Sequence, residues 1–199
     1  MALPEFITRG QGRITAAHFG TYDYTASMGI TAAHQGMLHP SCDFAKHVMQ
    51  VALSGTGLWL SDGATNVMPV GGRAGVHAAW KLHAAQVRHS LVGGFYQGWD
   101  LHPAQLVTRY AAVFAFFLEG LGPASERLRN FVDKAAKATL VGDVFDDAAT
   151  GQGLLNYFLR GMNCGAITPA EAVEMSGLTV AELQSRSFAK IMAGRRAAG

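Results

Sequence analysis

The sequence has few cysteines, few charged residues and no long apolar run, and each shortage excludes a class of protein. Two cysteines in 199 residues cannot build a disulfide framework. Charged residues make up 15% of the chain and hydrophobic residues 49%, a balance that excludes intrinsic disorder. The net charge of +2 is too small to indicate a nucleic-acid partner. No stretch of about 18 apolar residues predicts a membrane span.

The first residues also lack the pattern of a secretory signal, because no basic segment is followed by an apolar stretch. We therefore expect a cytoplasmic protein with no membrane partner. Glycine, in contrast, is abundant, with 24 residues spread through the chain. Such glycines favour a catalytic domain rich in loops over a flexible linker.

The first half of the chain alternates short apolar runs with helical patterns, which is typical of parallel βα units. We predict strands over 14–19, 58–60 and 95–99, and helices over 42–54, 76–91 and 104–121. In the first of these helices, Ser41 is the expected N-cap. Its expected inward stripe consists of Phe44, Val48, Val51 and Ala52.

The second half is predicted to be helical throughout. Ser125 is the expected cap of a helix over 125–137, and an acidic turn is expected at Asp143, Asp146 and Asp147. A short helix over 154–162 follows, and capping boxes at 168–171 and 179–182 begin two more helices.

Three predicted strands are too few for a closed barrel, which needs eight strands and about 250 residues. The fold class is therefore α/β, either a small layered sheet or part of a larger barrel. We divide the chain into an atypical N-terminal segment, three βα units and a helical C-terminal extension, over 1–11, 12–121 and 122–199.

Polar residues and glycines follow the predicted strands, at the edge where parallel sheets carry active sites. After the first strand, Asp23 near Gly20 suits a hard divalent cation, and a turn residue is the alternative. After the second, Ser61 and Asp62 stand before Gly63, where a simple Asp-Gly turn is the alternative.

The third strand end brings Asp100, His102 and Gln105 within one turn. His102 suits an acid, a base or a ligand of a substrate oxygen, and a helix cap is the equally weighted alternative.

A zinc site near Cys42 and His47 is the weaker hypothesis, because no second pair of ligands has matching spacing. We expect Cys42, Asp43 and His47 to form the start and the solvent flank of a helix instead.

At these residues the chain resembles a known family. Residues 17–29, Ala-His-Phe-Gly-Thr-Tyr-Asp-Tyr-Thr-Ala-Ser-Met-Gly, resemble the Phe-Gly-x-x-Asp-x-x-x-x-x-Gly segment of the HpcH/HpaI aldolase and citrate lyase β-subunit superfamily. Residues 98–105 resemble its segment ending in Ile-His-Pro-x-Gln. The resemblance extends over 12–196 and is greatest to an aldolase-like branch that carries His-Phe-Gly-Thr-Tyr-Asp-Tyr-Thr-Ala. Residues 177–183 and 186–188 also fit that branch.

The resemblance implies a (β/α)8 barrel of the phosphoenolpyruvate/pyruvate type, of which the three strands here are the sixth to eighth. It implies Mg²⁺ or Mn²⁺, held by Asp23 and by a glutamate from an earlier strand that this chain does not contain. The implied protein is a carbon–carbon lyase or aldolase that acts on a 2-oxo acid or acyl-CoA-type substrate through an enolate.

The catalytic residues expected on this basis are Asp100 and His102. The expected substrate-binding residues are Gly20, Thr21, Ser61, Asp62 and Gln105.

Two alternatives stay open, a catalytically inactive barrel fragment with a binding or structural role, and phosphoryl transfer from phosphoenolpyruvate. Because an incomplete barrel leaves strand edges open, we expect the chain to form homo-oligomers or to need a missing N-terminal half.

Overall fold

A computed structural model describes residues 3–137 and 148–198 of the chain. The chain divides into two units, Met1–Ala112 (unit 1) and Val113–Gly199 (unit 2). The boundary falls inside a long helix, whereas the sequence pattern predicts it after residue 121. The acidic turn expected at Asp143, Asp146 and Asp147 lies outside the described residues.

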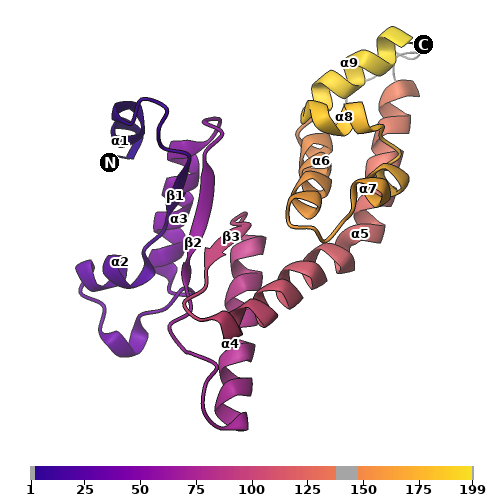
Figure 1. Cartoon of the computed structure of the whole chain (residues 1–199). Coiled ribbons are helices and arrows are strands. Elements are labelled where there is room, and N and C mark those ends of the chain that lie inside the picture. Colours follow the sequence, from indigo (N-terminus) through magenta and orange to yellow (C-terminus); the bar gives the residue numbers. More distant parts are fainter. Residues whose placement is uncertain (1–2, 138–147, 199) are drawn as a thin grey trace. The chain divides into compact units, whose positions relative to one another are not determined.

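Unit 1 is built on a parallel sheet of three strands in the order β1-β2-β3 (Figure 1). The strands are β1 (Ala16–His18), β2 (Trp59–Ala64) and β3 (Gln97–Trp99). In the register, Ala16 pairs with Trp59 and Ser61 pairs with Gln97. The α/β class and the three parallel strands predicted from the sequence are confirmed.

Helices follow each strand of unit 1. They are α2 (Thr21–Ser27), η1 (Ala32–His34) and α3 (Pro40–Leu53) after β1, α4 (Arg73–Val92) after β2, and η2 (Pro103–Gln105) with the start of α5 (Leu106–Lys137) after β3. Helix α1 (Leu3–Arg9) precedes the sheet and adds Leu3 and Ile7 to the edge of its core. The buried centre of this core consists of Phe19, Cys42, Met49, Leu53 and Phe95.

Helix α3 corrects two predictions. Its N-cap is His39, whose side chain accepts a hydrogen bond from the Ser41 backbone N–H, and not Ser41 itself. Its buried positions are Cys42, Lys46, Met49 and Leu53. The expected stripe is wrong, because Phe44 and Val51 are 66% and 80% exposed. The inward face includes Lys46, whose buried position depends on a partner in the sheet.

Strand β2 is longer than predicted, since 61–64 were expected to form a loop. Asp62, Gly63 and Ala64 are buried strand residues, and the acidic side chain there is paired with Lys46. His47 is exposed, as expected for the solvent flank of α3, but Cys42 is fully buried in the core.

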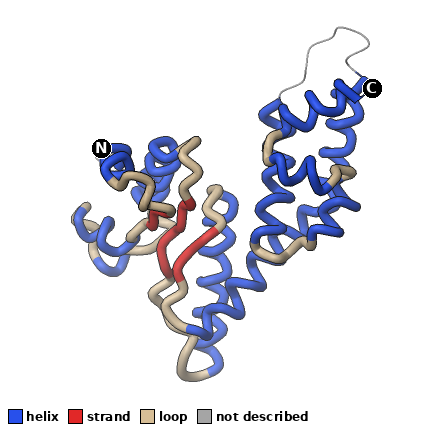
Figure 2. The backbone as a smooth tube through the Cα atoms, turned by 45° about the horizontal axis from the view of Figure 1, so that its top comes forward, coloured by secondary structure: helices blue, strands red, loops and turns tan. Residues whose placement is uncertain are grey.

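Unit 2 consists of helices among its described residues (Figure 2). These are most of α5 and then α6 (Ala148–Asn163), α7 (Pro169–Ser176), α8 (Val180–Ser185) and α9 (Phe188–Ala198). The capping boxes predicted at 168–171 and 179–182 are confirmed at the starts of α7 and α8. No helix in the described ranges is long and apolar enough to cross a membrane.

The predicted break between two helices near residue 123 is wrong, because α5 continues through Pro123. Ser125 caps no helix and instead donates its hydroxyl to the Leu121 carbonyl inside α5, at 2.6 Å. Leu128 and Val132 continue the buried stripe beyond this point. Their burial stabilises the helix, and this stabilisation offsets the loss of the backbone hydrogen bond that Pro123 cannot donate.

Two glycines of α6 differ in what surrounds them. A Cβ on Gly151 would lie 2.4 Å from the ring of Phe188, which is fully buried. A Cβ on Gly153 would meet no atom within 4 Å. The close approach of α6 to α9 therefore requires glycine at position 151, and no close approach requires it at position 153.

Candidate functional site

Side-chain hydrogen bonds join the segments that follow the three strands. The Tyr22 hydroxyl donates to the Ala64 carbonyl at 3.0 Å and accepts from the Asn66 N–H at 3.1 Å. The Gln105 amide donates to the Thr65 carbonyl at 2.9 Å. The segments after β1, β2 and β3 therefore meet at one edge of the sheet, which we call the carboxyl edge.

After β1, two predicted site residues lie in the first turn of α2. Asp23 is exposed, and its carboxylate has no partner among the described residues. Thr21 is 2% exposed, and its Oγ1 is the one buried side-chain oxygen or nitrogen in 3–137 and 148–198 without a hydrogen-bond partner. Gly20, which precedes α2, is exposed.

The close approach of Thr21 to β2 depends on Gly63, because a Cβ there would lie 2.0 Å from Thr21 Oγ1. An Asp-Gly turn was the alternative at this position, but Gly63 is a strand residue whose missing side chain makes room for Thr21.

In β2, Ser61 and Asp62 point to opposite faces, because successive side chains of a strand alternate. Asp62 is fully buried and accepts from Lys46 Nζ at 2.9 Å, from Ser90 Oγ at 2.7 Å and from the Gly63 N–H at 2.7 Å. Since Lys46 belongs to α3 and Ser90 to α4, these helices cover the Asp62 face of the sheet.

Asp43, once considered for zinc, joins α3 to α4 instead. Its Oδ1 lies 2.8 Å from His89 Nε2 and 3.2 Å from Lys46 Nζ. Burial tends to raise the pKa of Asp43, but the hydrogen bonds from His89 and Lys46 outweigh burial and lower it. The carboxylate is therefore committed to this contact.

After β3, Asp100 is held by two basic side chains. Arg109 lies 2.7 Å from Oδ2 through Nε and 2.8 Å from Oδ1 through Nη2, and His83 Nε2 lies 2.9 Å from Oδ1. Burial alone would raise the pKa of Asp100, but the hydrogen bonds from His83 and Arg109 lower it to about 2. Asp100 therefore stays ionised and is a weak proton acceptor at neutral pH.

The remaining predicted residues of this segment have structural contacts. His102 caps η2, with its Nδ1 accepting from the Ala104 N–H at 3.1 Å. Gln105 is fully buried, and its Oε1 accepts from the N–H groups of Leu101 and His102 at 2.8 and 3.3 Å. The cap alternative for His102 is thus what the structure shows, and its Nε2 has no partner among the described residues.

Three residues of this edge were not among the predicted site residues, namely His83, Arg109 and His18. The only sequence signal for Arg109 was its place one turn into a helix that begins just after Asp100. His18 is the last residue of β1, where register pairs it with Ser61.

His18 Nδ1 lies 2.7 Å from Ser61 Oγ, and its ring meets the edge of Trp99 with centroids 4.6 Å apart. These three side chains lie on the sheet face opposite to Asp62.

For a divalent cation, the described residues provide one free carboxylate at the carboxyl edge, Asp23. They contain no group of three or more His, Cys, Asp or Glu side chains that could hold a metal ion. Mg²⁺ is commonly bound through one or two carboxylates and several waters. Asp23 alone could therefore fill one ligand position of such a site.

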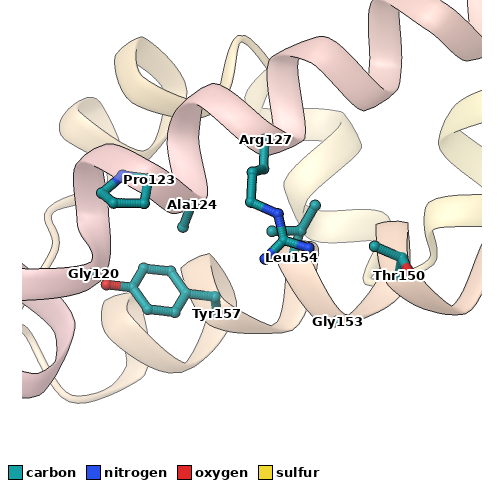
Figure 3. Close-up of a pocket in the computed structure, with 8 residues that line it drawn as sticks. All are labelled: Gly120, Pro123, Ala124, Arg127, Thr150, Gly153, Leu154 and Tyr157. Carbon is teal, nitrogen blue, oxygen red and sulfur yellow. The ribbon is translucent and has the colours of Figure 1, made fainter.

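Unit 2 contains a separate cavity of about 430 Å³ between α5 and α6 (Figure 3). Its lining consists of Gly120, Pro123, Ala124, Arg127, Thr150, Gly153, Leu154 and Tyr157. The Tyr157 hydroxyl donates to the Phe117 carbonyl, and burial raises the pKa of Tyr157 to about 12. None of the predicted site residues lines this cavity.

Among known families, a model described as "Domain of unknown function (DUF6986)" matches residues 1–191. The chain belongs to this family. No curated protein and no solved structure matches the chain. The resemblance to the HpcH/HpaI superfamily stays a prediction.

Proposed function

We propose that this chain supplies the last three βα units of a (β/α)8 barrel of the HpcH/HpaI type, and that the barrel is a metal-dependent carbon–carbon lyase. Its substrate would be a 2-oxo acid or an acyl-CoA-type molecule. One observation carries the proposal. The segments after three parallel strands, with Asp23, Asp100 and His102, are joined at a single carboxyl edge. In barrels of this kind the active site is built at that edge.

The two faces of the sheet support the partial barrel. Helices α3 and α4 cover the Asp62 face, as helices cover the outside of a barrel. The opposite face keeps Trp59 and Trp99 39% and 57% exposed. A three-stranded sheet also has two open edges, which a barrel removes by closing. We infer that further strands, from upstream residues or from a second copy in a homo-oligomer, complete the barrel in the cytoplasm.

Three residues of the chain would have different roles at this edge. Asp23 would hold Mg²⁺ or Mn²⁺, which supplies positive charge to stabilise an enolate when bound. His102 presents Nε2 as an acid, a base or a ligand of a substrate oxygen. Asp100, kept ionised by Arg109 and His83, orients the segment that carries His102.

A second candidate is a catalytically inactive scaffold that binds other strands. It is favoured by the internal hydrogen bonds of Asp62, Asp100 and Gln105, which leave these predicted site residues little capacity for a ligand. A scaffold needs no free carboxylate at the carboxyl edge, so metal binding by Asp23 separates the two candidates.

The test uses the chain together with any residues encoded directly upstream. Mn²⁺ binding is followed by electron paramagnetic resonance in the wild type, Asp23→Asn and the matched control Asp133→Asn, an exposed carboxylate of α5. We expect at least a tenfold loss of Mn²⁺ affinity in Asp23→Asn and none in the control. Equal affinities in all three proteins would overturn the metal assignment.

The same proteins are assayed for decarboxylation of oxaloacetate, because this reaction releases the pyruvate enolate that such a site stabilises. Cleavage of the aldol adduct of pyruvate and acetaldehyde and of a malyl thioester of coenzyme A is measured alongside it. Turnover that requires Mn²⁺ and Asp23 supports the lyase. A metal-loaded wild type without turnover on any of the three substrates supports the inactive scaffold.

A further inference from the structure

A small cluster of side chains lies on the sheet face opposite to Asp62 and consists of His18, Ser61 and Trp99. His18 and Trp99 are the last residues of β1 and β3, so the cluster adjoins the carboxyl edge. His18 is exposed and Trp99 is 57% exposed. The two rings meet across the middle strand, on which Ser61 stands. The cluster is therefore open to a ligand that occupies the carboxyl edge.

The imidazole of His18 has a defined orientation, although it is accessible. Its Nδ1 lies 2.7 Å from Ser61 Oγ, and its ring contacts Trp99 at an interplanar angle of 84°. These two contacts restrain the ring. Its Nε2 has no hydrogen-bond partner among the residues that the structure describes. The free nitrogen is thus the one that faces away from Ser61.

The second contact of Ser61 favours one tautomer. The Ser61 hydroxyl donates to the Asp62 backbone carbonyl at 3.3 Å. When the hydroxyl proton is used there, Ser61 Oγ accepts from His18, and in that tautomer Nδ1 carries the hydrogen and Nε2 keeps its lone pair. This arrangement is the one in which a histidine can take a proton from a substrate.

The charge state agrees with this tautomer. Burial lowers the pKa of His18, and the Asp62 carboxylate on the other face acts in the opposite direction. Asp62 is itself neutralised by Lys46 at 2.9 Å. The imidazole is therefore neutral at neutral pH and available as a base.

We propose that His18 Nε2 is the general base of the carboxyl edge and that Ser61 and Trp99 are positioning residues. The proposal rests on the proposed lyase function, with aldol adducts of a 2-oxo acid as the substrates that the resemblance implies. The substrate hydroxyl gives its proton to Nε2, and the electron pair of that O–H bond forms the new carbonyl. The adjacent carbon–carbon bond breaks, and its electrons remain on the 2-oxo acid as an enolate. The imidazolium then returns its proton to the enolate carbon, so the base is regenerated.

The state of His18 is measured first, independently of activity. Imidazole nitrogen NMR of the full chain should show the Nδ1–H tautomer for His18 and a pKa below its usual value of about 6.5. In Ser61→Ala the tautomer should shift toward Nε2–H, because the acceptor for Nδ1–H is removed. A wild-type His18 in the Nε2–H form would overturn the proposal whatever the activity.

Kinetics on the aldol adduct of pyruvate and acetaldehyde provide the second test, with Mn²⁺ present. His18→Gln should lower kcat at least a hundredfold with KM little changed, since general bases contribute about 10²–10⁴-fold. It should also abolish the acidic limb of the kcat/KM profile. Ser61→Ala should lower kcat about tenfold and shift that limb. His34→Gln, an exposed histidine of η1, should keep wild-type activity.

The outcomes separate the two proposals. A wild type that cleaves the adduct while His18→Gln keeps kcat within threefold overturns the base and leaves the lyase standing. A wild type that binds Mn²⁺ without cleaving any substrate overturns the lyase and, with it, the assignment of aldol adducts.

Discussion

The buried pair of Lys46 and Asp62 makes the stability of unit 1 depend on one contact between α3 and β2. Both residues are at most 3% exposed, and Lys46 Nζ lies 2.9 Å from Asp62 Oδ2. Lys46→Met keeps most of the volume of the side chain and removes the positive charge. Asp62 then keeps the hydrogen bonds from Ser90 and the Gly63 N–H but loses its cation.

The magnitude follows from electrostatics in a partly screened interior. At 2.9 Å and an effective dielectric constant of about 20, the Coulomb attraction is about 6 kcal/mol. The dehydration of both ions offsets much of this attraction, so the intact pair adds little net stability. Removing one partner costs about 3–5 kcal/mol, because the other charge stays buried. We expect Lys46→Met to lower the free energy of unfolding of unit 1 by that amount.

The double variant Lys46→Met with Asp62→Leu tests this cause. It removes both charges and their dehydration cost, so it should be more stable than Lys46→Met alone. Two independent losses would instead add, and the double variant would be the least stable of all.

The assay can follow unit 1 alone. All three tryptophans of the chain, Trp59, Trp80 and Trp99, belong to unit 1, so tryptophan fluorescence during urea unfolding reports on this unit. Lys81→Met, at an exposed position of α4, is the matched control and should change stability by less than about 0.5 kcal/mol. The reasoning fails if Lys46→Met costs no more than this control, or if the double variant is less stable than both single variants.

Three further predictions concern other parts of the chain. In α6, Gly151→Ala should destabilise unit 2 because its Cβ would enter the Phe188 ring, whereas Gly153→Ala should stabilise it by about 1 kcal/mol, as circular dichroism during urea unfolding would show. The hydrogen bonds from Arg195 outweigh burial and lower the pKa of Glu182 to about 2, so their contribution is present above about pH 4.3 and is lost as the pH falls toward 2. Arg195→Gln should therefore cost about 1 kcal/mol at pH 7 and less at pH 2, and an equal cost at both pH values would contradict this. Thr21→Val replaces an unpaired buried hydroxyl and should stabilise unit 1 by about 1 kcal/mol in the fluorescence assay. If the variant also raised KM for the substrate, the Thr21 hydroxyl would be a group that contacts the substrate.

Local signals in the sequence were sufficient for much of the fold. Thr168 and Thr179 with the acidic residues three positions later predicted the starts of α7 and α8, because a capping box is complete within four residues. The alternation of strands and helices in unit 1 was equally local. The strand order follows from it, since consecutive parallel βα units place successive strands side by side.

The wrong predictions concern positions whose burial depends on residues that are distant in the sequence. Lys46 is buried on α3 because Asp62 stands opposite to it on β2, and no pattern within α3 indicates this. Val51 was assigned to the inward face because it is apolar, but its position on α3 is exposed. In α5, a break was predicted after residue 121 because Ser125 suits the N-cap of a new helix. The buried stripe on both sides of this position stabilises one continuous helix.

The position of the candidate site was predictable, but the roles of its residues were not. Residues after parallel strands must meet at one edge, and Asp23, Asp100 and His102 follow two of these strands. Their partners, however, come from elsewhere in the fold. His83 reaches Asp100 from α4, and the strand position of Asp62 became visible only with the sheet register.

Hydrogen-bond capacity separates the residues that hold the fold from those that remain for chemistry. Asp62 and Asp100 each accept several bonds from basic or hydroxyl partners, so a ligand could bind them only by displacing those partners at a cost. At the same edge, the Asp23 carboxylate and the Nε2 atoms of His18 and His102 have no partner among the described residues. The carboxylate can serve as a ligand of a cation, and each of the two imidazole nitrogens can accept or donate a proton. The enolate reaction that we propose requires those functions, and the internal bonds of the neighbouring residues hold the surrounding segments in place.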